Sequence, residues 1–403
     1  GQYVFFTKMY GDFVGFLYGW SIFTVIQTGS IASITYIFAE YTQYFIELPR
    51  FAHDIEKGFR VALPYIGNIY PLENIGVKAL TISAILFHSG VNYFGIVFGG
   101  RFAAFFTSLK IVLISAIIGC GFAFGTGSFD NFTTDIAGFS LSNPMLVGGI
   151  IAAFSAAFWA YDGWNNITYI AGEVIRPQKN IPRGLIIGTL VIITVYVLIN
   201  LAYTYVLPID EMAASSLVAA DVAKRSIGAM GGAFIAAAVM ISTFGTSNGT
   251  IMVSSRVFFA MAEDGLFFRT IGRVQPRFRT PANALLLQAA WASVLVLSGT
   301  FDLLTDMLVF VSWIFYALGA YGVFVLRKKF PDAERPYKVA GYPAIPMIFV
   351  AFATAFVFLT LYFDITNYAE GKTEIVYSLF GLLLVASGVP FYWFFKRRKP
   401  LSE

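Results

Sequence analysis

A lysine in the middle of a long apolar run is the first residue whose chemistry needs an explanation. Lys110 lies about ten residues from either end of a run that extends roughly from Gly100 to Gly125. Ten residues of α-helix rise about 15 Å, which is farther than a lysine side chain can reach toward a membrane surface. Its ammonium must therefore find acceptors inside the protein. It is either a fixed positive charge where an ion-coupled protein would hold its cation, or a structural lysine bonded to helix carbonyls.

A second polar interruption lies in another apolar run, between Phe158 and Asn166, where the sequence reads FWAYDGWNN. The pair Asp162-Gly163 favours a break, because glycine weakens a helix and aspartate competes for backbone N–H groups. A broken helix at membrane depth is tolerated where it lines a cavity or is buried in protein, and it frees backbone groups to hold a ligand. The alternative is a kink whose polar side chains are satisfied locally. We favour the binding site.

Small and hydroxylated residues form a third run, STFGTSNGT, from Ser242 to Thr250. The spacing from Gly245 to Gly249 is that of helices that pack closely. The hydroxyl groups could also accept a hydrogen bond from Lys110 if the two helices meet, so both interpretations stay open.

The elements that carry these residues must be membrane helices. Of 403 residues, 58% are hydrophobic and 12% are charged, about half the share usual in soluble domains. A span needs about 20 apolar residues. We predict ten spans and hence an all-α polytopic membrane protein; they are Val14–Glu40, Ile75–Val97, Gly100–Gly125, Val147–Gly172, Leu185–Leu207, Gly228–Ser255, Asn283–Gly299, Leu303–Leu326, Tyr342–Phe363 and Ile375–Phe395.

The basic residues predict the orientation of these spans. On the face that holds both chain ends there are nineteen lysines and arginines, against seven on the opposite face. Cytoplasmic loops carry such an excess. We therefore expect both ends to be cytoplasmic, with the loop from Tyr41 to Asn74 outside.

Several other classes of function find no support. His88 and His53 have no serine, cysteine or second histidine at useful spacing, and no nucleophile–base pair indicates an intramembrane enzyme. There is no phosphate loop and no metal-ligand cluster, so no cofactor is expected. Cys120 is the single cysteine, which excludes a disulfide framework. The net charge of +4 is small and unevenly placed, and it indicates orientation in a membrane rather than nucleic-acid binding.

The broken-helix motif, followed by Glu173, Pro177 and Asn180-Ile181-Pro182, resembles the sixth helix and following loop of the amino acid–polyamine–organocation superfamily. The resemblance is closest to bacterial members of its L-type amino acid transporter family. It continues in VNYFGIVFGGRFAAFFTSLKIVLI, SNGTIMVSSRVFFAMAEDG, RTPANALLLQ and ERPYKVAGYPAIP.

That family has twelve spans, built as a five-plus-five inverted repeat with two more at the end. By this resemblance, residues 1–403 form a single transporter domain that corresponds to helices three to twelve. The first broken helix, which in the family holds the substrate carboxylate, would precede Gly1. We expect that the chain without it does not transport.

The resemblance also implies roles for individual residues. Trp159 matches the aromatic gate over the substrate, and backbone carbonyls near Trp159, Ala160 and Asp162 would accept from the substrate ammonium. Tyr161 is a further substrate-binding candidate beside them, and Asn165 would hold the unwound segment or the substrate. Lys110 matches the lysine at the sodium position of ion-coupled relatives, with Thr246 and Ser247 beside it. Weaker pocket candidates are Val25, Ile26, Phe310 and Trp313.

These features together imply a sodium-independent carrier of neutral amino acids in the cell membrane, an exchanger that works by alternating access. The bulk of Trp159 favours small substrates such as alanine or serine. A proton-coupled carrier, or a carrier of amines or basic amino acids, remains an alternative, which Asp162 could support. A membrane sensor that binds amino acids without moving them is another. Animal members attach to a heavy subunit through a cysteine in the loop after helix three, and the stretch from Tyr41 to Asn74 has none, so no such partner is expected.

Overall fold

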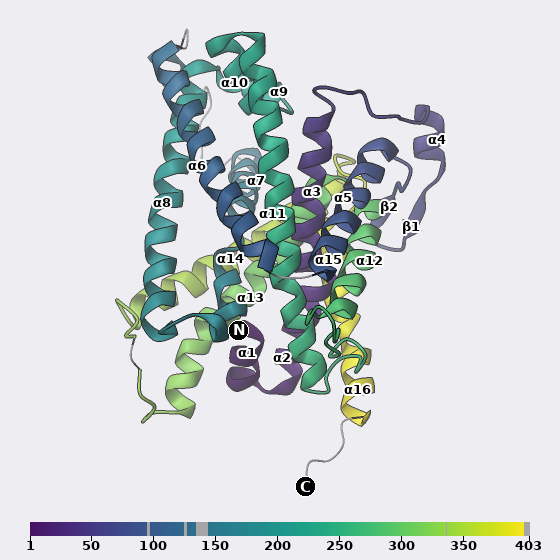
Figure 1. The fold of residues 1–403 in the computed structure, drawn as a ribbon, viewed down its shortest axis with the longest axis vertical. Helices are drawn as coiled ribbons and strands as arrows, with labels where there is room; N and C mark the ends of the chain where they lie inside the picture. The colour runs from purple at the N-terminus through teal and green to yellow at the C-terminus, as the bar shows by residue number, and fades with distance from the viewer. Residues whose placement is uncertain (95–96, 125–126, 134–143, 336, 399–403) are drawn as a thin grey trace.

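The computed structural model describes residues 1–94, 97–124, 127–133, 144–335 and 337–398. Within these ranges the chain is almost entirely helical (Figure 1). The predicted limits at Gly125 and the basic residue Lys399 lie outside the described residues. The helical elements are α1 (Gln2–Tyr10), α2 (Asp12–Ser21), α3 (Gln27–Thr42), α4 (His53–Gly58), α5 (Ile75–Tyr93), α6 (Val97–Phe124), α7 (Pro144–Tyr161), α8 (Pro177–Val206), α9 (Ile209–Ala214), α10 (Val218–Ile227), α11 (Ala229–Glu263), α12 (Ala282–Ser298), α13 (Phe301–Lys329), α14 (Ala344–Ala369), α15 (Tyr377–Ala386) and α16 (Gly388–Arg398).

The predicted spans correspond to long apolar helices. Among the described residues, eight helices are long and apolar enough to cross a membrane, and two shorter apolar helices, Thr107–Ala123 and Ala282–Ser298, account for the third and seventh predicted spans. The chain is therefore an all-α polytopic membrane protein, as predicted. The predicted edges differ from the observed ones: the second span ends at Tyr93 rather than Val97, and α11 continues to Glu263, eight residues past the predicted Ser255.

The first span is continuous from Asp12 to Thr42, but a π-helical turn, η1 (Ile22–Ile26), interrupts it. A π turn removes backbone carbonyls from the regular ladder, and these need other donors. Trp291 Nε1 on α12 donates to Thr24 O at 2.9 Å, and the Thr28 hydroxyl donates to Phe23 O at 2.6 Å. The bulge is thus held by partners from its own helix and from a neighbouring one.

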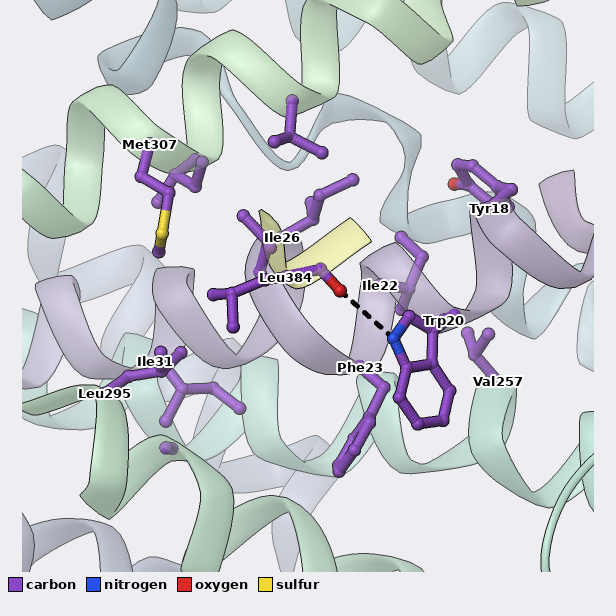
Figure 2. Packing of buried hydrophobic residues seen from close by; sticks show 14 of the residues in the cluster. Tyr18, Trp20, Ile22, Phe23, Ile26, Ile31, Val257, Leu295, Met307 and Leu384 are labelled. Carbon is purple, nitrogen blue, oxygen red and sulfur yellow. Dashed lines mark hydrogen bonds between the residues drawn. The ribbon is translucent and has the colours of Figure 1, made fainter. Parts of the chain in front are cut away.

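This first span forms the centre of the main hydrophobic core. Figure 2 shows Trp20, Phe23, Ile26 and Ile31 packed among residues of α11, α12, α13 and α15, with Trp20 Nε1 bonded to Leu384 O at 3.2 Å. Burial of these apolar side chains between helices fixes the position of the span that faces the broken helix.

Buried polar pairs connect the helices around that core. Ser247 on α11 bonds Thr35 on α3 at 2.6 Å, Asn92 on α5 donates to Asn248 at 2.7 Å, and Ser254 donates to Gln288 on α12 at 2.8 Å. Interhelical hydrogen bonds of this kind help to fix helix register where lipid supplies no hydrophobic drive between helices.

A small β-hairpin in the loop between α3 and α5 was not predicted. Strands β1 (Val61–Leu63) and β2 (Gly67–Ile69) pair antiparallel. The loop between α14 and α15 adds to the hairpin, because Asn68 N–H donates to Glu374 O at 2.9 Å and Val376 N–H donates to Ile66 O at 2.8 Å. The hairpin therefore ties the last helices to the α3–α5 region.

Candidate functional site

The predicted break lies where the sequence placed it. Helix α7 ends at Tyr161, Gly163 adopts a left-handed conformation with φ 95°, and a 3₁₀ segment, η3 (Trp164–Glu173), follows. Asp162 N–H donates to Trp159 O at 3.0 Å, which closes a single turn rather than continuing the α-helix. The unwound turn is confirmed, and Gly163 is the residue that makes it sterically possible.

Asp162 is held by a tyrosine from a different helix. The Tyr316 hydroxyl on α13 donates to Asp162 Oδ1 at 2.8 Å. One turn earlier, the rings of Phe158 and Trp313 lie with centroids 4.0 Å apart. The carboxylate at the break therefore has a hydrogen-bond partner already, although each of its oxygens can accept further bonds.

Trp159 lies between α3 and the start of α13. Its Nε1 donates to Ser33 Oγ at 3.3 Å, and its ring meets Phe301 edge-on, with centroids 5.0 Å apart and an interplanar angle of 88°. The side chain is therefore anchored to α3 and to α13. Its role as a gate stays a prediction.

The carbonyls expected to receive the substrate ammonium already accept hydrogen bonds. Tyr196 OH on α8 donates to Ala160 O at 3.0 Å, and the ring of Tyr161 lies edge-on to Tyr196 at 4.9 Å. Trp159 O accepts from Asp162 N–H. Each carbonyl oxygen retains a second lone pair, so a ligand could still bind there. The break was expected to free these oxygens, but each already accepts one hydrogen bond.

Asn165 belongs to a polar network on the other side of the break. Its Nδ2 donates to Gln2 Oε1 at 2.8 Å and approaches Tyr169 OH at 3.5 Å. Tyr18 OH also donates to Gln2 and lies 3.1 Å from Tyr169 OH. Asn165, 3% exposed, thus joins the segment after the break to α1 and, through this network, to α2.

Lys110 and Thr246 meet as predicted. Lys110 Nζ donates to Thr246 Oγ1, and both residues line a cavity of about 280 Å³ between α6 and α11. Asn166 lines the same cavity, and Gln27 Nε2 donates to Asn166 Oδ1 at 3.0 Å. The cavity therefore reaches from the partly buried lysine to the segment that follows the break.

Two features of α11 differ from the predictions. Ser247 points toward α3, where it bonds Thr35, and not toward Lys110. A Cβ atom added to Gly249 would meet nothing within 4 Å, because Gly249 lines the Lys110 cavity. The close-packing interpretation is therefore wrong for Gly249.

The weaker pocket candidates lie in the hydrophobic core. Val25, Ile26 and Phe310 are at most 3% exposed and belong to the main buried cluster. Trp313 lies against Phe158 with the rings tilted, and it stacks on Phe349 of α14. These residues pack in the main hydrophobic core, and the structure does not bring them to the break itself.

Several residues at the site were missed. Asp306 is a charged residue inside a span, which is the criterion that singled out Lys110, and it accepts a hydrogen bond from Ser155 at 2.6 Å. Gln2, Tyr18 and Tyr316 carried no local signal, because their role depends on which helices touch. The described residues hold no group of three or more histidine, cysteine or carboxylate side chains that could bind a metal ion.

Comparison with known proteins agrees with this geometry. The model of the amino acid permease family matches residues 1–386. The human b(0,+)-type amino acid transporter 1 is 29% identical over 400 residues, 99% of this chain and 75% of the relative. The serine/threonine exchanger SteT of Bacillus subtilis (strain 168) is 28% identical over 402 residues, 99% of this chain and 82% of the relative. The mouse large neutral amino acids transporter small subunit 2 is 28% identical over 395 residues, 98% of this chain and 68% of the relative.

The relatives are membrane transporters rather than enzymes, and the family match covers nearly the whole chain. A helix broken at membrane depth and a partly buried lysine in a pocket beside it are features suited to holding a polar solute inside the membrane. The chain belongs to the amino acid permease family and is an amino acid transporter.

Proposed function

We propose that this protein exchanges neutral amino acids across the cell membrane without sodium. The observation that carries the proposal is the Lys110 ammonium, which donates to Thr246 in a cavity that reaches the broken helix at Asn166. A fixed positive charge there supplies the electrostatic role that a bound cation would supply, and a second cation close by would be repelled. Among the described residues, no carboxylate lies within ion-pair distance of Lys110.

The substrate would bind at the unwound turn between α7 and η3. Its ammonium would use the second lone pairs of the carbonyls of Trp159 and Ala160 and the carbonyl of Asp162. Trp159, anchored on Ser33 and Phe301, would close over it from the side on which α7 begins. Asn165 and its network would hold the opposite side closed.

The geometry favours neutral over cationic substrates. Tyr316 already donates to the Asp162 carboxylate, so a cationic side chain would have to compete with that bond. The bulk of Trp159 favours small substrates such as alanine and serine. We also propose that both ends of the described chain are cytoplasmic, in line with the distribution of basic residues.

Exchange in liposomes tests the proposal. Vesicles that contain the purified full-length parent protein are loaded with unlabelled L-alanine and placed in labelled L-serine, in sodium or in choline buffer. We expect uptake that depends on internal alanine and is equal in the two buffers. Uptake that requires sodium, or a failure of unlabelled alanine to displace labelled serine, would reject the proposal.

The same vesicles separate the alternatives. A proton-coupled carrier would accumulate serine when an inward pH gradient is imposed without internal amino acid. A carrier of basic amino acids would exchange lysine in preference to alanine. A sensor would bind labelled serine in detergent and show no flux.

A further inference from the structure

Helices α7 and α13 touch along three successive contacts, which we name the α7–α13 seam. From the start of the helices inward these are Ser155 with Asp306, Phe158 with Trp313, and Asp162 with Tyr316. Two carboxylate–hydroxyl bonds therefore bracket one aromatic contact. The third contact lies at the helix break, and the first lies one turn before Trp159.

The first contact of the seam is a short hydrogen bond to a carboxylate. The Ser155 hydroxyl donates to Asp306 Oδ1 at 2.6 Å, and Ser155 is 5% exposed. A hydrogen bond to an ionised acceptor is shorter and stronger than a neutral one. Among the described residues, no lysine, arginine or histidine nitrogen lies within 4.0 Å of the Asp306 carboxylate, so the Ser155 hydroxyl is a main source of stabilisation for this carboxylate.

The contacts of the seam hold α7 against α13. This helix packs against α13 and α14, and only 11% of the span that contains it is buried inside the protein. An element with few buried contacts separates from its neighbours more easily than a core helix. The α3 span, by comparison, is 78% buried. Loss of the Ser155–Asp306 bond would therefore loosen α7 more than loss of one such bond would loosen a helix of the core.

Ser155 and Trp159 are four residues apart and so lie one above the other on the same part of α7. While Ser155 is bound to Asp306, Trp159 lies against Ser33 and Phe301, where the proposed function has it close over the substrate. Opening of this side moves Trp159 away, and α7 cannot carry it far while Ser155 stays bonded to α13.

We propose that Ser155 and Asp306 form a latch that holds the transporter closed on the face where α7 and α13 begin, and that this bond breaks each time the face opens. The inference rests on the proposed exchange function. Both are positioning residues: they act on the substrate through Trp159 and do not touch it.

Variants of the latch test the inference through the sidedness of transport. Ser155→Ala and Asp306→Ala each remove the hydrogen bond, and Asp306→Asn keeps an acceptor oxygen without the charge. The ratio of the apparent KM values at the two membrane faces is measured by serine exchange. We expect either alanine variant to lower the apparent KM at the face where α7 and α13 begin, relative to the opposite face, by about tenfold. Asp306→Asn should shift it less, and the double alanine variant no more than the single ones.

Asp302, one turn earlier on the same helix and exposed, provides the matched control. Asp302→Asn should leave the ratio unchanged, because it removes a carboxylate without touching Ser155. Equal changes at both faces in the latch variants would overturn the inference. So would an effect of Asp302→Asn as large as that of Asp306→Asn.

A cross-link separates failure of the latch from failure of the proposed function. Cysteines replace Ser155 and Asp306 in a Cys120→Ser background, and a short bis-thiosulfonate reagent joins them. We expect cross-linked protein on gels, exchange blocked, and recovery after reduction. Cross-linking without loss of exchange, or no cross-linking at all, would overturn the latch. Absence of exchange in the unmodified protein, with the cross-link still formed, would instead reject the proposed function.

Discussion

Replacement of Lys110 by methionine is the perturbation that bears most directly on sodium independence. Methionine keeps about the same length and volume but removes the charge. Lys110 donates to Thr246 in a cavity of about 280 Å³, which has room for about nine water molecules at roughly 30 Å³ each. The variant therefore removes the ammonium from this pocket while it keeps a side chain of similar size there.

The size of the effect follows from the lost bond. A hydrogen bond that involves a charged group contributes about 1.5–3 kcal/mol, which corresponds to roughly 10- to 150-fold in an equilibrium between two states if only one of them contains the bond. Thr246→Val removes the acceptor but leaves the charge, which water in the cavity can solvate. We expect Thr246→Val to reduce the free energy that stabilises the bonded state by about 1 kcal/mol or less.

The assay is serine exchange in liposomes, with the apparent KM measured separately at each face. We expect Lys110→Met to abolish exchange or to make it asymmetric, with the apparent KM at one membrane face raised at least about tenfold relative to that at the other face. Ile111→Met is the control, because Ile111 is the next residue of α6 and is 53% exposed. If Lys110→Met exchanges with unchanged kinetics at both faces, Lys110 has no central role.

Three further substitutions test the site and its frame. Gly163→Val should abolish exchange by opposing the left-handed turn at φ 95°. Gly149→Val, in α7 itself, should be tolerated in flux measurements, because a Cβ atom added to Gly149 would meet nothing within 4 Å. Tyr316→Phe removes the donor to the carboxylate at the break, a loss of about 1.5–3 kcal/mol, and should raise the KM for neutral substrates and increase competition by lysine. Gly67→Ala should destabilise the hairpin by at least about 1–3 kcal/mol, because φ is 136° and a Cβ would lie 2.2 Å from a carbonyl oxygen of the α14–α15 loop. Gly58→Ala, with open space around it, is its control; equal melting temperatures for the two would refute the account of the hairpin.

Properties set by one stretch of chain were predictable from the sequence. The bilayer requires about 20 apolar residues per span, so hydropathy located the helices to within several residues. Asp162-Gly163 gave the break, because the conformational preference of glycine acts locally. Lys110 was expected to find an acceptor inside the protein because its side chain is shorter than its distance from the membrane surface, and it donates to Thr246.

Contacts between distant segments were not predictable in the same way. Gly245 and Gly249 have the spacing of a packing motif, yet Gly249 faces a cavity, because spacing does not say which neighbour approaches. Ser247 follows Thr246 directly and so points about 100° away around the helix, toward Thr35. The π turn at η1 also went unpredicted. It depends on Trp291 from another helix to satisfy the carbonyl of Thr24.

The central claim is that an amino acid binds at the unwound turn of α7 beneath Trp159. A structure determined with L-serine in sodium-free buffer tests it most directly. We expect the serine ammonium within about 3.2 Å of the carbonyl oxygen of Trp159, Ala160 or Asp162, with Trp159 over it. Serine bound elsewhere in the protein, with this turn left empty, would contradict the claim.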